Sequence, residues 1–62
     1  MARNLRRLRA ERGLTQEEVA QRAGLNRNYV GMIEREENSP TLDVVERIAQ
    51  VLGVDGAVLL TP

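Results

Sequence analysis

The sequence contains no cysteine and no histidine, and its only aromatic residue is Tyr29. Without cysteine, neither disulfide bonds nor thiolate-bound metal can stabilise the fold. Without histidine, the chain lacks the usual zinc ligand and the usual proton-transfer group near neutral pH. No Gly-rich phosphate loop is present either, and so short a chain leaves no room for a substrate pocket of ordinary size. We therefore expect no enzyme, no metal site and no small-molecule cofactor.

Long apolar runs are also missing, and none approaches the roughly 20 residues that a membrane helix needs. The basic N-terminus, with Arg3, Arg6, Arg7 and Arg9, is not followed by an apolar segment, which argues against a signal peptide. We expect a cytoplasmic protein with no membrane partner. Its 62 residues predict a single domain, 1–62, with a small and almost wholly aliphatic core.

The net charge is zero, but the charges are unevenly distributed along the chain. Residues 1–35 hold eight arginines against four glutamates, which is a net charge of +4. Residues 36–62 hold one arginine against five acidic residues, which is a net charge of −4. This asymmetry favours a nucleic-acid partner more than the total charge does, although arginines that merely solvate helices would give the same counts. All basic residues are arginine. This choice suits bidentate contacts to phosphate or guanine, but a GC-rich coding sequence would produce the same preference for arginine.

Glycines and capping residues divide the chain into four helices and a short fifth, with no strand alternation. We predict helices over residues 2–12, 16–23, 27–35, 42–52 and 56–60. Left-handed glycines end three of them, namely Gly13, Gly24 and Gly53. Side-chain oxygens are expected to cap the start of every helix but the first, from a Thr15–Glu18 capping box and from Asn26, Thr41 and Asp55. The predicted fold class is all-α, a compact bundle.

The segment 16–35 has the spacing of two short helices that cross steeply. Ala20 is small where the first helix meets the second, and Gly24 adopts φ > 0 at the turn without a Cβ penalty. A small apolar wedge behind the turn consists of Val19, Leu25, Val30 and Ile33. The outer face of the second helix is then free to enter a major groove.

Six short motifs lie at fixed spacing between Leu5 and Leu52. They are Leu-Arg at 8–9, Gly-Leu-Thr-Gln-Glu-Glu-Val-Ala at 13–20, Gly-Leu at 24–25, Tyr-Val at 29–30, Ile-Glu at 33–34 and Pro-Thr-Leu-Asp at 40–43. With these motifs the sequence resembles the lambda-repressor/Cro (XRE-type) helix-turn-helix DNA-binding family. The resemblance implies a transcriptional regulator of bacterial or phage type, and more specifically a repressor, that binds double-stranded DNA sequence-specifically through residues 27–35. Such proteins read pseudo-palindromic operators as homodimers, with half-sites about 34 Å apart.

The resemblance places base contacts at Arg27 and Asn28, and Met32 follows one turn later. Arginine matches the O6 and N7 atoms of guanine, asparagine matches the N6 and N7 atoms of adenine, and a methionine suits a thymine methyl group. Arg27 and Asn28 could instead grip phosphate, and Met32 could simply be exposed. Gly31 is expected beside Met32 on the outer face, where either close approach to DNA or helix packing would explain it.

Phosphate contacts are expected at five polar positions: Gln16, Asn26, Tyr29, Asn38 and Ser39. Gln16 resembles the family glutamine at the positive end of a helix, which favours an anion. For Gln16, Asn38 and Ser39 the alternative is a solvated polar residue, and for Tyr29 it is partial burial in the core. Two acids after the third helix, Glu36 and Glu37, are expected to point away from DNA.

In the family that the sequence resembles, the arginine of the first helix and the glutamate near the end of the third form an ion pair. Arg9 and Glu34 occupy these positions here. The pair would fix the reading helix to the scaffold, and the loss of one partner would leave a partly buried charge alone.

The apolar C-terminal end offers a possible dimer seam, formed by Val54, Val58, Leu59 and Leu60. These residues could equally cover the first helix. A protein-interaction module, such as an antitoxin or an adaptor with the same fold, is the alternative function. The polar, DNA-compatible chemistry of Gln16, Arg27 and Asn28 favours DNA binding over that alternative.

Overall fold

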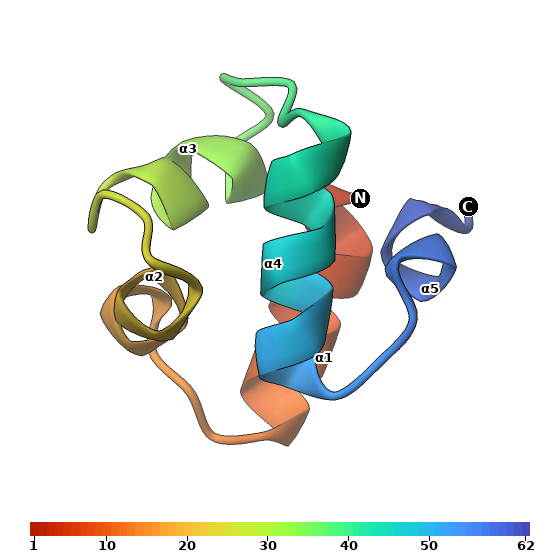
Figure 1. The fold of residues 1–62 in the computed structure, drawn as a ribbon, viewed down its shortest axis with the longest axis horizontal. Helices are drawn as coiled ribbons and strands as arrows, with labels where there is room; N and C mark the ends of the chain where they lie inside the picture. The colour runs from red at the N-terminus through yellow and green to blue at the C-terminus, as the bar shows by residue number, and fades with distance from the viewer.

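Five helices are present in a computed structural model that describes residues 1–62 (Figure 1). They are α1 (Ala2–Glu11), α2 (Gln16–Ala23), α3 (Tyr29–Glu34), α4 (Leu42–Leu52) and α5 (Gly56–Leu60). The all-α prediction is confirmed, and α2, α4 and α5 have the predicted bounds. Helix α1 ends one residue before its predicted end. Helix α3 is shorter at both ends than the predicted 27–35, so the turn before it is longer than expected.

Three of the predicted side-chain caps are present at helix N-termini. The Thr15 hydroxyl accepts a hydrogen bond from the Glu18 N–H at 3.0 Å, and the Glu18 carboxylate accepts one from the Thr15 N–H at 2.9 Å. The bond from the Thr15 backbone lowers the pKa of Glu18, because it stabilises the charged carboxylate. Thr41 and Asp55 cap α4 and α5. Helices α2, α4 and α5 therefore begin where the sequence indicates.

The predicted cap at Asn26 is wrong. The Asn26 Oδ1 atom accepts from the Asn28 N–H at 2.9 Å, and the Asn26 carbonyl accepts from the Tyr29 N–H at 2.9 Å. These bonds close a turn over residues 26–29, so α3 begins only after Asn28. Asn28 occupies the N-cap position but makes no side-chain capping bond.

Four helices end in the same way, with a left-handed residue that satisfies the last carbonyl groups. Three of these residues are the predicted glycines, Gly13, Gly24 and Gly53, at φ of 64°, 71° and 71°. The fourth is Glu36, at φ of 60° after α3. The Glu36 N–H donates to the Ile33 carbonyl and the Glu37 N–H donates to the Met32 carbonyl, at 3.0 and 2.9 Å. A residue with a Cβ therefore stands where the other three helices use glycine.

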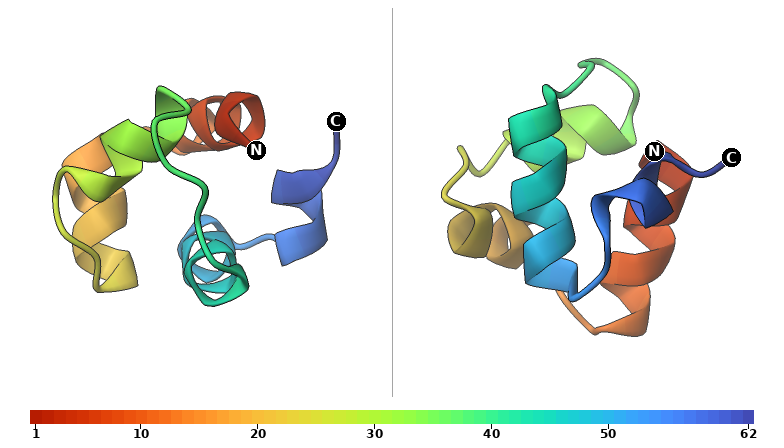
Figure 2. Two further views of the ribbon diagram at one scale, coloured as in Figure 1. Left: turned by 90° about the horizontal axis from the view of Figure 1, so that it is seen from above. Right: turned by 45° about the vertical axis from the view of Figure 1, so that its right-hand side comes forward.

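The core lies between α4 and the surrounding helices, with α2 on one side of α4 and α5 on the other (Figures 1 and 2). Ala20 is fully buried, which allows α2 to approach its neighbours closely. The largest fully buried side chains are Leu5, Val19, Val30, Ile48, Leu52 and Leu59. Each such side chain stabilises the fold by about 1.5–3 kcal/mol. None of the five helices has both the length and the apolar character required to cross a membrane.

Helix α1 is tied to the C-terminal end of the chain through Asn4. The Asn4 amide donates to the carbonyl groups of Val58 at 3.2 Å and Leu59 at 3.0 Å, and also to that of Thr61. These carbonyl groups lie at the end of α5, where no further helical turn satisfies them. The N- and C-termini consequently lie on the same side of the molecule (Figure 2).

Candidate nucleic-acid interface

An ion pair fixes the end of α3 to α1. The Glu34 side chain is only 3% exposed, and its carboxylate accepts from Arg9 Nε at 2.7 Å and from Arg9 Nη2 at 3.0 Å. Arg9 Nη1 also donates to the Leu14 carbonyl at 2.9 Å. The hydrogen bond to Glu34 raises the pKa of Arg9. The structure thus brings Arg9 of α1 and Glu34 of α3 together, and their ion pair holds the end of α3 against α1.

Gln16 joins this network from the first residue of α2. Its Nε2 atom donates to Glu34 Oε1 at 3.0 Å, so one carboxylate receives bonds from both α1 and α2. An amide nitrogen carries two hydrogens, and the second N–H of Gln16 remains available for a ligand. The half-buried Gln16 is therefore held in place and keeps a free donor.

Gly31 does not lie on the open outer face that the sequence suggested, because it is buried. A Cβ atom at this position would stand 3.1 Å from Gln16 Oε1 and 3.0 Å from Arg35 Nη1. The missing side chain lets the N-terminus of α2 approach α3. Close packing of polar side chains over the helix therefore explains Gly31.

The three predicted base contacts lie in the turn before α3 and on α3 itself, and we call Arg27, Asn28 and Met32 the reading surface. Arg27 and Asn28 are exposed in the turn before the helix, and not in its first turn as expected. Met32 is half-exposed one turn further on. Arg27 makes no ion pair within the chain, in contrast to Arg9 and Arg35. Its guanidinium group is free to meet a partner.

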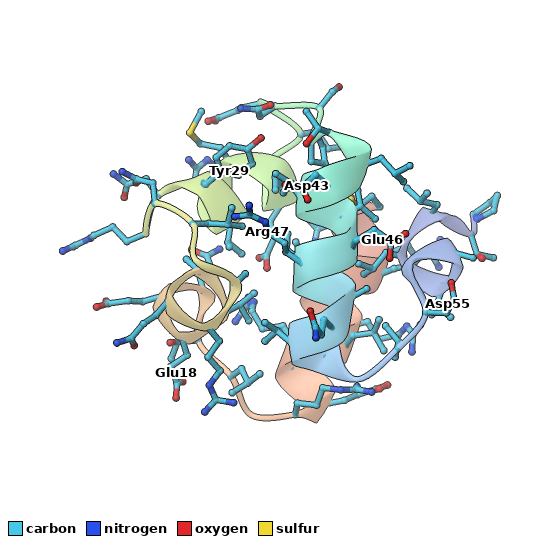
Figure 3. All side chains as sticks on the ribbon, in the orientation of Figure 1. Glu18, Tyr29, Asp43, Glu46, Arg47 and Asp55 are labelled. Carbon is cyan, nitrogen blue, oxygen red and sulfur yellow. The ribbon has the colours of Figure 1, made fainter.

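The other predicted phosphate contacts lie in two regions: Asn26 and Tyr29 at the start of α3, and Asn38 and Ser39 after its end. Asn26 is exposed beside the reading surface, although its Oδ1 atom is engaged by the turn. Tyr29 is half-buried and packs against the core on α3 (Figure 3). Asn38 and Ser39 lie in the connection from α3 to α4.

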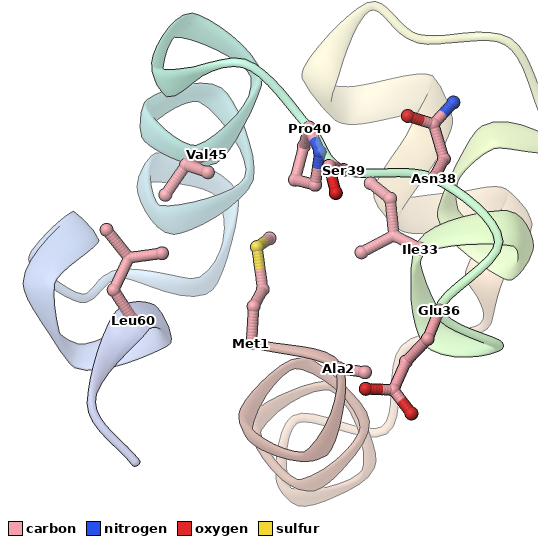
Figure 4. A pocket seen from close by; sticks show the side chains of 9 residues that line it. All are labelled: Met1, Ala2, Ile33, Glu36, Asn38, Ser39, Pro40, Val45 and Leu60. Carbon is pink, nitrogen blue, oxygen red and sulfur yellow. The ribbon is translucent and has the colours of Figure 1, made fainter.

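A surface cavity of about 360 Å³ opens beside this connection, which contradicts the expectation that no pocket of ordinary size fits in the chain. Its lining comes from α1, α3, α4, α5 and the α3–α4 connection (Figure 4). The lining residues are Met1, Ala2, Ile33, Glu36, Asn38, Ser39, Pro40, Val45 and Leu60. Glu36 contributes the only ionisable side chain of this lining.

The predicted dimer seam is partly wrong. Leu59 is fully buried between α5 and the rest of the core, so it cannot face a partner. Val54 is half-buried and packs against the same core. Val58 and Leu60 are exposed by 38% and 52%. Helix α5 therefore covers the core with one face and presents two apolar side chains to the surroundings.

Sequence reasoning missed two arginines near the end of α3. Arg6 Nη1 donates to the Glu34 carbonyl and so satisfies the end of the helix. Arg35 forms a bidentate ion pair with Glu37, at 3.0 and 3.2 Å, which raises the pKa of Arg35 and lowers that of Glu37. Helical spacing could not reveal either contact, because one joins separate helices and the other lies in an irregular connection.

Arg47 lies on the face of α4 that is directed toward α2 and α3 (Figure 3). It forms an ion pair with Asp43 at 3.1 Å, one turn earlier in the helix. Its Nη1 atom lies 3.9 Å from the position of a Cβ atom on Gly24. Arg47 therefore borders the turn between α2 and α3, with its charge already paired.

Comparison with known proteins shows close relatives over most of the chain. A family model described as helix-turn-helix matches residues 5–59. An uncharacterized HTH-type transcriptional regulator of Sinorhizobium fredii is 46% identical over 59 residues, which cover 95% of this chain and 77% of that protein. The curated relative from Neisseria meningitidis, described as a hypothetical transcription factor, is longer, and the chain spans 58% of it.

Solved structures match equally well. The crystal structure of hypothetical transcription factor NHTF from Neisseria superposes with a TM-score of 0.95 at 41% identity, over 98% of this chain and 70% of that one. The biofilm regulator SinR, solved in complex with DNA, gives a TM-score of 0.91 at 30% identity, over 97% of both chains.

Proposed function

We propose that this chain, which belongs to the helix-turn-helix family, is a sequence-specific regulator of transcription that binds double-stranded DNA as one domain, 1–62. The observation that carries the proposal is the arrangement around Glu34, since its bonds to Arg9 and Gln16 hold α3 rigidly against α1 and α2. A fixed helix can place side chains on base edges without an ordering cost at the moment of binding. The DNA complex of SinR, a structural relative, supports the same use of the fold.

In this proposal the reading surface enters the major groove and Gln16 holds the DNA backbone. Arg27 has a free guanidinium group that matches the O6 and N7 atoms of guanine, and Asn28 matches adenine. The second N–H of Gln16, at the positive end of α2, donates to a phosphate. Asn26, Tyr29, Asn38 and Ser39 are proposed as further backbone contacts. Phosphate contacts position the protein, and the reading surface supplies the sequence preference.

The sharpest test of this function is a selection of bound sites from random double-stranded DNA, followed by binding measurements with Arg27→Ala. We expect one enriched motif, and a loss of about 1–3 kcal/mol for the variant together with relaxed preference at one base pair. A uniform loss on all sequences would show that Arg27 contacts phosphate. Failure of the wild-type protein to enrich any motif would refute DNA reading and favour a protein-interaction module.

We further propose that two copies bind one pseudo-palindromic operator through the exposed apolar residues Val58 and Leu60. The molecule measures 24 × 23 × 18 Å, so two adjacent copies can place their reading helices one DNA turn, about 34 Å, apart. Two exposed apolar side chains make a small interface, and the dimer therefore assembles on DNA more than in free solution. Occupancy of the operator excludes other proteins from it, which is the basis of repression.

The dimer is tested by two matched substitutions, Leu60→Glu and Leu42→Glu. Both leucines are exposed, at 52% and 66%, but Leu42 is the first residue of α4 and does not belong to α5. We expect Leu60→Glu to abolish cooperative binding to a two-half-site duplex, and Leu42→Glu to leave it unchanged. Equal effects of the two variants, or cooperativity that survives Leu60→Glu, would refute this seam.

A further inference from the structure

Arg35 stands at the end of α3, and its guanidinium group reaches back over Gly31. Its Nη1 atom lies 3.0 Å from the position that a Cβ atom on Gly31 would occupy, and Gln16 Oε1 lies 3.1 Å from the same position. Polar side chains from α2 and from the end of α3 therefore converge where α3 has no side chain of its own. The Gln16 atom nearest to this spot is its amide oxygen, which can only accept, so the guanidinium group of Arg35 is the group here that can donate to an anion.

The guanidinium group of Arg35 is already bound in the geometry that a phosphate would adopt. Its Nε and Nη2 atoms donate to the two carboxylate oxygens of Glu37, at 3.0 and 3.2 Å. Carboxylate and phosphate both accept this fork of parallel N–H bonds from arginine. The carboxylate of Glu37 thus already occupies the two N–H donors of Arg35 that a phosphate would use.

The Arg35–Glu37 pair is exposed and can exchange its partner. The two side chains are 57% and 53% exposed, and such surface ion pairs add little net stability. The mutual hydrogen bonds raise the pKa of Arg35 and lower that of Glu37, so both groups are charged at neutral pH. A DNA phosphate that reaches Arg35 therefore replaces one anion by another, without burial or unfolding of any part of the chain.

The adjacent acids Glu36 and Glu37 have side chains in different places, and the backbone of Glu36 is left-handed. Its side chain lines the surface cavity with Met1 and Ala2 (Figure 4), whereas that of Glu37 returns to Arg35. The two acids, both expected to point away from DNA, therefore lie in different surroundings, Glu36 at the cavity and Glu37 against the guanidinium group of Arg35. The two acids provide matched charges in different places.

We propose that Arg35 is a phosphate-binding residue of the DNA interface, and that Glu37 is its internal competitor, which holds the guanidinium fork until DNA displaces it. This inference rests on the proposed function and deepens it, because it adds a backbone contact and a residue that limits DNA affinity. In the free protein Glu37 keeps Arg35 ordered over Gly31. In the complex the released carboxylate turns to solvent.

The test is a titration of the selected DNA site, followed by fluorescence anisotropy, with wild type and four variants: E37Q, E36Q, R35Q and the double variant R35Q/E37Q. We expect E37Q to bind about threefold more tightly, because the competitor is removed. E36Q loses the same charge next to it and should change the affinity little. R35Q should bind about tenfold more weakly and show a salt slope lower by about 1.

The double variant separates competition from general repulsion. If Glu37 acts through Arg35, R35Q/E37Q binds like R35Q, because the competitor has nothing left to block. Equal gains from E37Q and E36Q, or a gain from E37Q that persists without Arg35, would overturn the inference. Unchanged binding by R35Q would overturn it while the proposed function stands. If wild type binds no selected DNA at all, the proposed function and the inference are both wrong.

Discussion

Replacement of Arg9 by methionine tests the idea that the ion pair behind α3 supports the whole domain. The Glu34 carboxylate, whose side chain is 3% exposed in the wild type, would keep Gln16 Nε2 as its one remaining donor. Removal of one partner from a buried pair costs about 3–5 kcal/mol. Arg9 is itself 21% exposed and Gln16 keeps its bond, so we expect the lower end, about 3 kcal/mol.

This loss is large for so small a domain. A chain of this length has a free energy of unfolding of about 3–9 kcal/mol. At the lower end of this range R9M would be about half unfolded, and at the upper end it would keep about two thirds of its stability. Thermal unfolding followed by circular dichroism should show a midpoint lower by about 12 °C or more. Helix α3 should lose its fixed position first, because the pair joins it to α1.

A second substitution shows whether charge is the cause. In R9M/E34Q the buried residue is a neutral amide that can still accept a bond from Gln16, and a neutral group costs less to bury than a charge. We therefore expect the double variant to be more stable than R9M by about 1–2 kcal/mol. If E34Q gives no recovery in this background, the loss comes from the packing of Arg9 or its bond to Leu14, and the charge argument is refuted.

Three further predictions concern the backbone around the site. Gly31→Ala should change stability by less than about 1 kcal/mol, because improved helix propensity offsets the displaced side chains of Gln16 and Arg35; its DNA affinity should fall about tenfold as these donors move, and an unaltered affinity would contradict the close packing seen here. Thr15→Ala should cost about 1 kcal/mol in denaturant unfolding through loss of the N-cap. Because the capping box lowers the pKa of Glu18, its contribution is present above about pH 4.5 and is lost as the pH falls through the folded-state value, so T15A should show a weaker acid dependence than wild type. Glu36→Gly should raise the unfolding free energy by about 1 kcal/mol, because glycine adopts φ of 60° without a Cβ penalty; a destabilised variant would show that the cavity contacts of the Glu36 side chain matter more.

The sequence predicted elements correctly where local chemistry alone decides them. Helices α2 and α4 each have a hydroxyl cap at one end and a left-handed glycine at the other, and both signals act within a few residues. The start of α3 was misplaced because an asparagine before an apolar segment suits an N-cap and a tight turn equally well. Only the structure shows that the Asn26 side chain closes the turn.

The candidate site was predictable only as far as the family resemblance reached. Arg9 and Glu34 are 25 residues apart, and no local pattern connects them. The bond from Gln16 to Glu34 and the return of Arg35 over Gly31 depend on how α2 and α3 cross, so no spacing predicts them. Leu59 was misjudged because five residues of α5 are too few to define an apolar face.

The Asn4 contacts with the end of α5 have a consequence for the order in which the chain folds. They join residues 54 to 57 positions apart in a chain of 62, so almost the whole polypeptide must be in place before they form. Contacts that close such long loops are made late, after the nucleus of nearer contacts has formed. Loss of the Asn4 hydrogen bonds should accelerate unfolding and leave the folding rate nearly unchanged. Asn4 therefore governs the lifetime of the native state rather than the rate of folding.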